Sequence, residues 1–174
     1  MSEINSCADL TASPEFDEAR QVYNQLLDDG KDPFSYMLQM QHDLQKSLAV
    51  KSSEHNPSPD ELGTIGQKFD WLRENKQAFD DEYREIVDAL PGMSLPEKDR
   101  SAVWKRWKSK YNDIRNRTFD DLTEDDLKEL KMEYIDMFIF LINMSFALDM
   151  NAEEMFIYYY TKNAENHKRA QNGY

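Results

Sequence analysis

The stretch TEDDLKELKMEYIDMFIFLINMSFALD, residues 123–149, decides the fold class. It opens with Thr123-x-x-Asp126, a helix-capping signature, and continues with apolar residues at helical spacing. Its apolar half, residues 137–148, is too short to span a bilayer and is typical of a helix buried against other helices. The pattern therefore predicts an all-α protein built around this helix, the longest that we expect.

Two pairs of acidic residues stand at i, i+3 spacing, Glu82 with Glu85 and Glu133 with Asp136. Both acids of a pair point from one face of their helix. Such pairs also occur on solvated helix faces, and 34 acids in 174 residues make chance matches easy. The apolar neighbours of the second pair argue for a partner, because buried charge is costly. If the two helices pack side by side, four carboxylates meet and favour Mg²⁺, or Mn²⁺, with substrate phosphates.

Other metal centres lack their ligands. A di-iron helical bundle needs Glu-x-x-His on its ligand helices, and His42, His55 and His167 do not stand in that relation to a glutamate on an apolar helix. Zinc sites need clustered Cys and His, and Cys7 is the only cysteine. The sequence thus favours magnesium or manganese and metal-assisted phosphate chemistry.

Composition bounds the remaining possibilities. With 174 residues, 5 Gly and 6 Pro, residues 1–174 are expected to form one helical domain. A formal net charge of -13 argues against stable nucleic-acid binding and against an anionic membrane surface. The single Cys7 excludes an intrachain disulfide, and residues 1–10 have neither the basic start nor the apolar run of a signal peptide. We expect a cytoplasmic protein.

Start and stop signals predict a bundle of about six helices. The expected helical segments are 14–30, 33–51, 59–75, 79–90, 96–117, 124–149 and 152–172. Ser94-x-x-Glu97 and Asn151-x-x-Glu154 are read as capping boxes before the fifth and the last of these. Residues 1–30 are the least determined part, an N-terminal helix whose role is expected to be packing against a partner.

Three polar residues of the last helix, Lys162, Asn166 and Arg169, form one stripe at spacings of four and three. An ammonium, an amide and a guanidinium on one face suit triphosphate oxygens. The alternative is a basic last turn that complements the helix dipole.

Eight of the 21 basic residues fall between Lys98 and Arg117, interleaved with tryptophans. Trp104 beside Lys105 and Lys108 could stack a base and hold phosphates. The more common outcome is a helix with packed aromatic residues and solvated lysines. A single-stranded nucleic-acid site conflicts with the acidity of the chain.

Gln41 and Asn143 fall on the apolar sides of their helices. An amide there can read a base edge, since it offers both a donor and an acceptor, or it can be a satisfied core amide.

Taken in order, these pieces resemble the all-α nucleoside triphosphate pyrophosphatases. The resemblance is to the branch that contains the dimeric dUTPases and the dCTP/dUTP diphosphatases of T-even-type bacteriophages. The similarity runs from about Lys31 to Tyr174. The motifs are Met40-Gln-x-x-Leu-Gln, Asp80-Asp-Glu-x-x-Glu, Ser101-Ala-Val-Trp-Lys-x-Trp-Lys, Glu133-x-x-Asp, Met150-Asn-Ala-Glu-Glu-Met-Phe and Lys162-Asn-x-x-Asn-x-x-Arg-x-Gln-Asn-Gly-Tyr.

The resemblance implies a homodimer that hydrolyses dCTP and dUTP, and also the diphosphates, to monophosphates with Mg²⁺. It would thereby clear cytosine and uracil deoxynucleotides and supply dCMP and dUMP to biosynthesis. By the family pattern the site residues divide into three groups: metal ligands Glu82, Glu85, Glu133 and Asp136, with Glu82 and Glu85 catalytic; phosphate ligands Lys162, Asn166, Arg169, Tyr174, Lys105 and Lys108; and base ligands Gln41, Gln45, Trp104 and Asn143.

Three positions depart from the pattern of the dimeric dUTPases. Gln45 stands where they have Asn, Ile139 where they often have His, and Arg106 where they have Trp. All three lie in motifs near the expected base pocket, which favours a dCTP/dUTP enzyme over a strict dUTPase. The alternatives are a pyrophosphatase of broader specificity and a non-catalytic helical interaction module.

Overall fold

The computed structural model describes residues 10–11, 13–51 and 57–173. Over these ranges it is helical and contains no strand, which confirms the all-α prediction. The α-helices are α2 (Pro14–Asp28), α3 (Pro33–Lys51), α4 (Ile65–Ala89), α5 (Glu97–Arg100), α6 (Tyr111–Arg115), α7 (Glu124–Phe146) and α8 (Ala152–Gln171). Short 3-10 helices span Pro59–Glu61, Ser101–Val103 and Phe119–Asp121.

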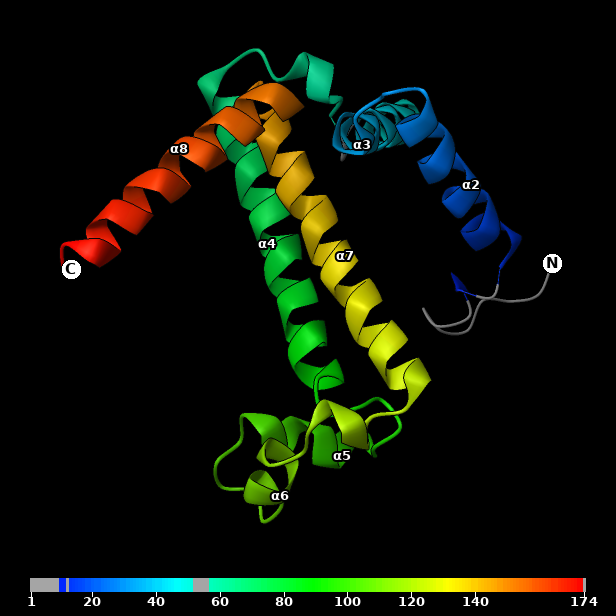
Figure 1. Ribbon diagram of the computed structural model, residues 1–174, viewed down its shortest axis with the longest axis vertical. Helices are drawn as coiled ribbons and strands as arrows, with labels where there is room; N and C mark the ends of the chain where they lie inside the picture. Colours follow the sequence, from blue (N-terminus) through cyan, green and yellow to red (C-terminus); the bar gives the residue numbers. More distant parts are fainter. Residues whose placement is uncertain (1–9, 12, 52–56, 174) are drawn as a thin grey trace.

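Helices α4 and α7 form the centre of the molecule. They run antiparallel and side by side, and their mutual contact is the most extensive between any two described elements (Figure 1). Helices α3 and α2 lie on one side of this pair, α5 and α6 lie at one end, and α8 projects away on the other side. The α4–α7 seam is therefore the frame on which the rest is placed.

One end of the seam is held by a buried tryptophan. The indole Nε1 of Trp71 donates a hydrogen bond of 2.6 Å to the backbone oxygen of Asn143. Trp71 packs with Leu62 and Ala147 in the hydrophobic core. An indole buried with its N–H satisfied contributes area without an unpaired donor.

The other end is held by Asp126 of α7, which is buried. Its carboxylate accepts hydrogen bonds from the backbone N–H and the hydroxyl of Ser94, at 2.7 and 2.8 Å, and from the Thr123 backbone N–H at 3.0 Å. Gly92 has a φ of 102°, and a Cβ there would lie 3.0 Å from Leu122 and 3.1 Å from Asp126. A glycine is thus required where the turn after α4 passes over the start of α7.

The starts of α7 and α8 were predicted correctly from their capping boxes. Thr123 and Asn151 cap α7 and α8 as expected. The expected break between residues 75 and 79 was wrong, because α4 is one continuous helix of 25 residues and is longer than α7. Pro59 starts only a 3-10 turn, and the helix itself begins after Thr64.

The long helix expected over residues 96–117 was also wrong. The structure has only α5, a 3-10 turn, an irregular stretch and α6. No acid stands between Asp99 and Asp113, so like charges such as Lys105 and Lys108 would face each other at helical spacing without compensation. Ser94 is no helix cap either, since its hydroxyl bonds Asp126.

Within the described ranges, no helix combines the length and the apolar character that crossing a bilayer requires.

We predict that Asp126→Ala destabilises the fold by about 2–3 kcal/mol, because it removes a helix cap and takes the acceptor from the N–H groups of Ser94 and Thr123. Burial raises the pKa of Asp126, but the hydrogen bonds from Ser94 and Thr123 outweigh it and lower the pKa to about 2. The stabilisation is therefore present above pH 4 and is lost as the pH falls toward 2. Denaturant unfolding at pH 7 measures it. The exposed neighbour Asp125, changed to Ala, should alter stability by less than about 0.5 kcal/mol; equal losses for both variants would refute the assignment.

Candidate active site

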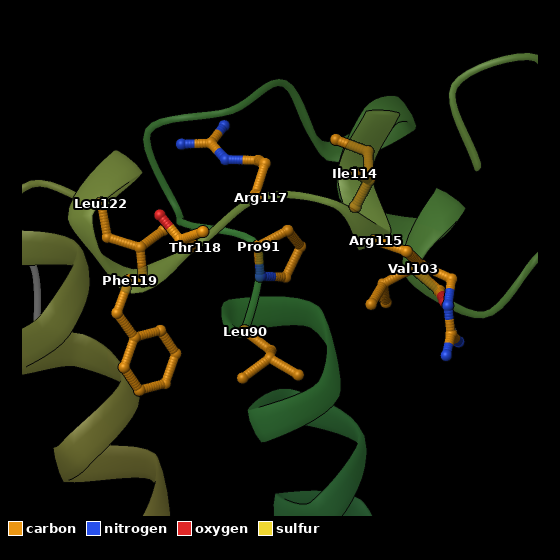
Figure 2. A pocket seen from close by; sticks show the side chains of 9 residues that line it. All are labelled: Leu90, Pro91, Val103, Ile114, Arg115, Arg117, Thr118, Phe119 and Leu122. Carbon is orange, nitrogen blue, oxygen red and sulfur yellow. The ribbon is translucent and has the colours of Figure 1, made fainter. Parts of the chain in front are cut away.

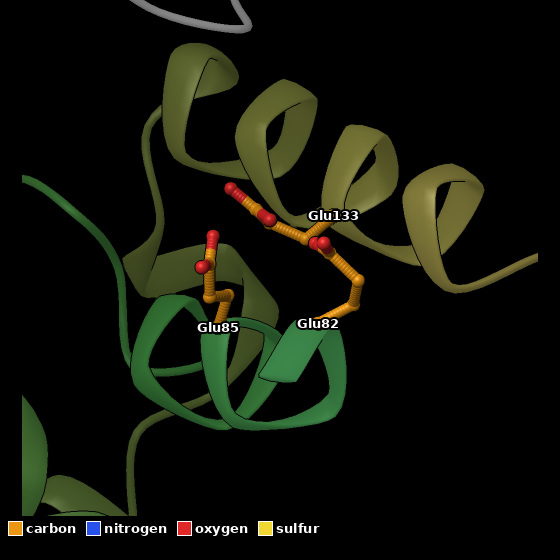
Figure 3. Close-up of side chains that lie close together, drawn as sticks. All are labelled: Glu82, Glu85 and Glu133. Atoms are coloured by element: carbon orange, nitrogen blue, oxygen red, sulfur yellow. The ribbon is translucent and has the colours of Figure 1, made fainter. Parts of the chain in front are cut away.

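Three predicted metal ligands meet across the α4–α7 seam. Glu82 and Glu85 come from α4 and Glu133 from α7, and one carboxylate oxygen of each lies within 4.8 Å of the others (Figure 3). Glu82 and Glu133 are partly buried, whereas Glu85 is exposed. The sequence thus placed these acids on converging helix faces, and the structure brings them together.

The fourth acid, Asp136, lies one turn along α7 from Glu133 and is coupled to the same group. Burial and the negative charge of Glu85 raise the pKa of Asp136. Burial, and then Glu85 and Asp136, raise the pKa of Glu82. The largest effect is on Glu133, where burial followed by repulsion from Glu85, Asp136 and Glu82 raises the pKa to about 7. The environment therefore raises the pKa of Glu82, Glu133 and Asp136 and disfavours their charged forms.

Among the residues that the structure describes, no basic side chain forms an ion pair with these acids. The neighbouring cations are paired elsewhere, Lys76 with Asp80 and Arg84 with Asp81. None of the ion pairs that the structure gives for residues 10–11, 13–51 and 57–173 includes any of the four clustered acids. An all-carboxylate donor set with partly open geometry fits Mg²⁺ or Mn²⁺ and does not suit a softer metal such as Zn²⁺.

A pocket of 380 Å³ lies farther along the same seam, between α3, α4 and α7. The predicted base ligands Gln41, Gln45 and Asn143 all line it. Gln41 is buried and its Nε2 donates a 2.9 Å hydrogen bond to Oδ1 of Asn143, which is also buried. The alternative of a satisfied core amide is confirmed, because the two side chains bond each other in the core. Both also border a cavity, and base binding stays a prediction.

Trp104 does not belong to this pocket. It lies in the irregular stretch after Ser101–Val103, and half of its surface is exposed. The Lys105 ammonium lies 4.5 Å from its ring centroid, and Trp107 packs edge-on at 6.1 Å. Lys105 and Lys108 are in the same segment, at the α5–α6 end of the molecule (Figure 1).

The stripe of Lys162, Asn166 and Arg169 is on α8, and all three are exposed. Arg169 forms an ion pair of 3.0 Å with Glu165. Figure 1 shows α8 leading away from α4 and α7 toward the C-terminus, so within one chain this stripe is carried away from the acid cluster. Tyr174, Cys7 and His55 lie outside the described residues.

Sequence reasoning missed the α4 side of the pocket. Trp71, Glu74, Asn75 and Ala78 line it and stand at helical spacing, and Glu82 follows one turn later on the same face. That periodicity was visible in the sequence. The error of splitting α4 after Asn75 concealed it.

A second pocket, of 270 Å³, lies beside the end of α4 and has an apolar lining that includes Leu90, Ile114 and Phe119 (Figure 2). Two guanidinium groups border it, but both bond backbone oxygens. Arg117 Nη2 donates to Asp121 at 2.7 Å and Arg115 Nη1 donates to Val103 at 3.3 Å. Because they donate to backbone oxygens, these arginines stabilise the irregular segment. We assign no anion site to them.

Comparison with known proteins gives closely similar relatives. A dCTP pyrophosphatase of Enterobacteria phage T4 is 43% identical over 174 residues, and one of Enterobacteria phage LZ5 is 42% identical over 174 residues; both matches cover 100% of each chain. A DNA replication protein of Enterobacteria phage T4 is 43% identical over 163 residues, which is 94% of this chain and 41% of that protein.

No protein-family model matches the chain, and no solved structure is significantly similar to it. The two full-length relatives agree with the all-α pyrophosphatase resemblance of the motifs, and the helical fold is consistent with it. On this identity over the whole of both sequences, the chain belongs to the family of T4-type phage dCTP pyrophosphatases.

Proposed function

We propose that this protein hydrolyses dCTP and dUTP, and also dCDP and dUDP, to the monophosphates with Mg²⁺, which Mn²⁺ can replace. The observation that carries the proposal is the arrangement of the acid cluster and the amide-lined pocket along one seam. The names of the two full-length relatives, both dCTP pyrophosphatases, support it. As an enzyme of phage type it would act in the host cytoplasm.

The spacing along the seam fits a nucleotide. On α7, Asn143 lies seven residues beyond Asp136, which corresponds to about 10 Å along the helix axis. On α4, Ala78 of the pocket lies one turn before Glu82 of the cluster. A base in the pocket would therefore place its 5′-phosphates over the carboxylates.

The residues of the chain take distinct roles in this proposal. Glu82, Glu85, Glu133 and Asp136 would hold the metal, which would lower the pKa of a bound water and neutralise phosphate charge. Glu82 would also orient the attacking water, with Glu85 beside it as the second catalytic acid. Gln41, Gln45 and Asn143 would bind the base.

Phosphate binding requires cations that one chain does not bring to the cluster. We assign this role to Lys162, Asn166, Arg169 and Tyr174, with Lys162 and Arg169 stabilising negative charge on the leaving group. Lys105 and Lys108 would contribute from the α5–α6 end, and Trp104, which lies outside the pocket of its own chain, would reach the base only from a second copy.

We propose further that the active form is a homodimer. The chain exposes 12830 Å², whereas a compact monomer of 20.6 kDa exposes about 8,900 Å². The excess exceeds what one partner buries in a standard interface. Much of it lies on α8, where Phe156 and Tyr160 are each 67% exposed and no residue is buried. A second copy would cover this face.

We predict that Glu133→Gln abolishes release of dCMP from dCTP, lowering kcat by a factor of about 10³ or more, since it removes a metal ligand without changing side-chain volume. Circular dichroism should show unchanged helix content. The control is Glu124→Gln, an exposed acid of the same helix paired only with Lys128, which should retain activity. Chromatography of the products with and without Mg²⁺ is the measurement. Turnover by Glu133→Gln at the wild-type rate would exclude the metal assignment.

A second prediction concerns pH and the metal-free protein. Because the folded pKa of Glu133 is raised to about 7 from 4.5, its favourable contribution is present below pH 4.5 and lost as the pH rises through 7. In EDTA, Glu133→Gln should raise Tm by a few degrees at pH 8 and hardly at pH 5. Adding Mg²⁺ at pH 8 should raise Tm of the wild type and not of the variant. The same Tm for both proteins at every pH would contradict the proposed repulsion.

A third prediction tests the dimer. Replacing both Phe156 and Tyr160 with Lys should weaken self-association by about 100-fold or more, because desolvated aromatic residues dominate interface energy. Replacing both with Leu keeps the face apolar and should preserve the dimer. Light scattering after gel filtration gives the mass of each protein. A wild-type monomer at micromolar concentration would disprove the dimer.

A further inference from the structure

The amide-lined pocket contains one charged group. Among the described residues that line it, Glu74 is the only acid and no Lys or Arg is present. Its carboxylate has a single ion contact, 3.7 Å to Arg73, and Arg73 makes its closer pair with Asp70 at 2.9 Å. Glu74 therefore remains available as a hydrogen-bond acceptor at the mouth of the pocket.

Glu74 lines the pocket from α4, farther from the acid cluster than Ala78 of the same lining. It precedes Glu82 by two turns of α4, about 12 Å along the axis. A pyrimidine nucleotide whose phosphates lie at the cluster points the edge with positions 3 and 4 away from its sugar. That edge would therefore face Glu74.

Asn75 adds a second acceptor beside Glu74. Its Nδ2 donates a 2.9 Å hydrogen bond to the backbone oxygen of Trp71, which can only accept. This contact fixes the orientation of the amide, so the Oδ1 of Asn75 is left to accept. Two adjacent acceptors match the two N–H bonds of an exocyclic amine.

Asn143 does not discriminate between cytosine and uracil. Oδ1 of Asn143 already accepts from Gln41, so its Nδ2 is left to donate. The O2 atom of a pyrimidine accepts in both bases. Cytosine and uracil differ at position 3, an acceptor in cytosine and an N–H donor in uracil, and at position 4, an amine in cytosine and a carbonyl in uracil. The contact with Glu74 and Asn75 is assigned to position 4, where two neighbouring acceptors match an amine and not a carbonyl. An ionised carboxylate cannot donate to a carbonyl, whereas a free amide could rotate to do so.

We propose that Glu74 is a specificity-determining residue that favours cytosine over uracil. Its carboxylate and Asn75 Oδ1 accept hydrogen bonds from the 4-amino group of cytosine, and they repel the O4 atom of uracil. The proposal rests on the proposed function. It implies that the enzyme hydrolyses dUTP with a lower kcat/KM than dCTP. Discrimination arises from a repulsive element as much as from an attractive one.

The test is Glu74→Gln, which keeps the shape and replaces the obligate acceptor with an amide that can rotate. The ratio of kcat/KM for dCTP to that for dUTP should fall by about tenfold, mainly through KM. Glu124→Gln, the same change at an exposed acid of α7 outside the pocket lining, is the matched control and should leave the ratio unchanged. An unchanged ratio in an active Glu74→Gln enzyme would overturn the proposal.

A binding measurement keeps the test decisive if Glu74→Gln loses turnover. Calorimetric titration with dCMP and dUMP should show that wild type prefers dCMP and that the variant has lost the preference. Equal affinities of the wild type for the two monophosphates would overturn the role of Glu74 while leaving the hydrolase intact. A wild type that hydrolyses neither dCTP nor dUTP would overturn the proposed function, and this inference with it.

Discussion

The contact between α4 and α7 forces like charges together, and the candidate site depends on that constraint. Glu82, Glu85 and Glu133 approach within 4.8 Å because the helices that carry them are fixed at both ends. The Trp71 bond to α7 fixes one end and the buried carboxylate of Asp126 fixes the other. Repulsion among the clustered carboxylates costs folding free energy, and the packing of α4 against α7 offsets that cost. A divalent cation between the carboxylates would replace the repulsion with attraction.

The carboxylates of Asp126 and Glu133 have pKa values that their surroundings shift in opposite directions. Asp126 is buried, yet hydrogen bonds lower its pKa to about 2, so it stays ionised and structural. Glu133 is less buried and has negative neighbours instead of donors, so its pKa rises to about 7. Both are on α7, less than two turns apart in sequence. The difference is in their neighbours, since Ser94 and Thr123 donate to Asp126 whereas acids of α4 and α7 surround Glu133, and neither property follows from composition.

The sequence was most informative where local chemistry decides structure. The capping boxes at Thr123 and Asn151 and the two acid pairs depend on residues within one turn, and the structure has both caps and brings three of the four acids into one cluster. Prediction failed between residues 96 and 117, where aromatic and basic residues have helical spacing but their charges repel along the helix. It also missed Glu74, because a residue that borders a pocket is recognised only when the three helices around it are placed.

The position of α8 keeps its basic residues away from the carboxylate cluster of the same chain, although the proposed reaction needs both groups together. The carboxylates and the amide pocket lie on the same seam, so a single chain has the groups assigned to metal and base. Lys162 and Arg169, two of the cations assigned to phosphate, are on a helix with no buried residue that leads away from that seam (Figure 1). A triphosphate beside four acids requires positive charge beyond one metal ion. On our proposal, therefore, the association that covers the aromatic face of α8 is also what fixes its basic stripe, and assembly and catalysis would depend on the same helix.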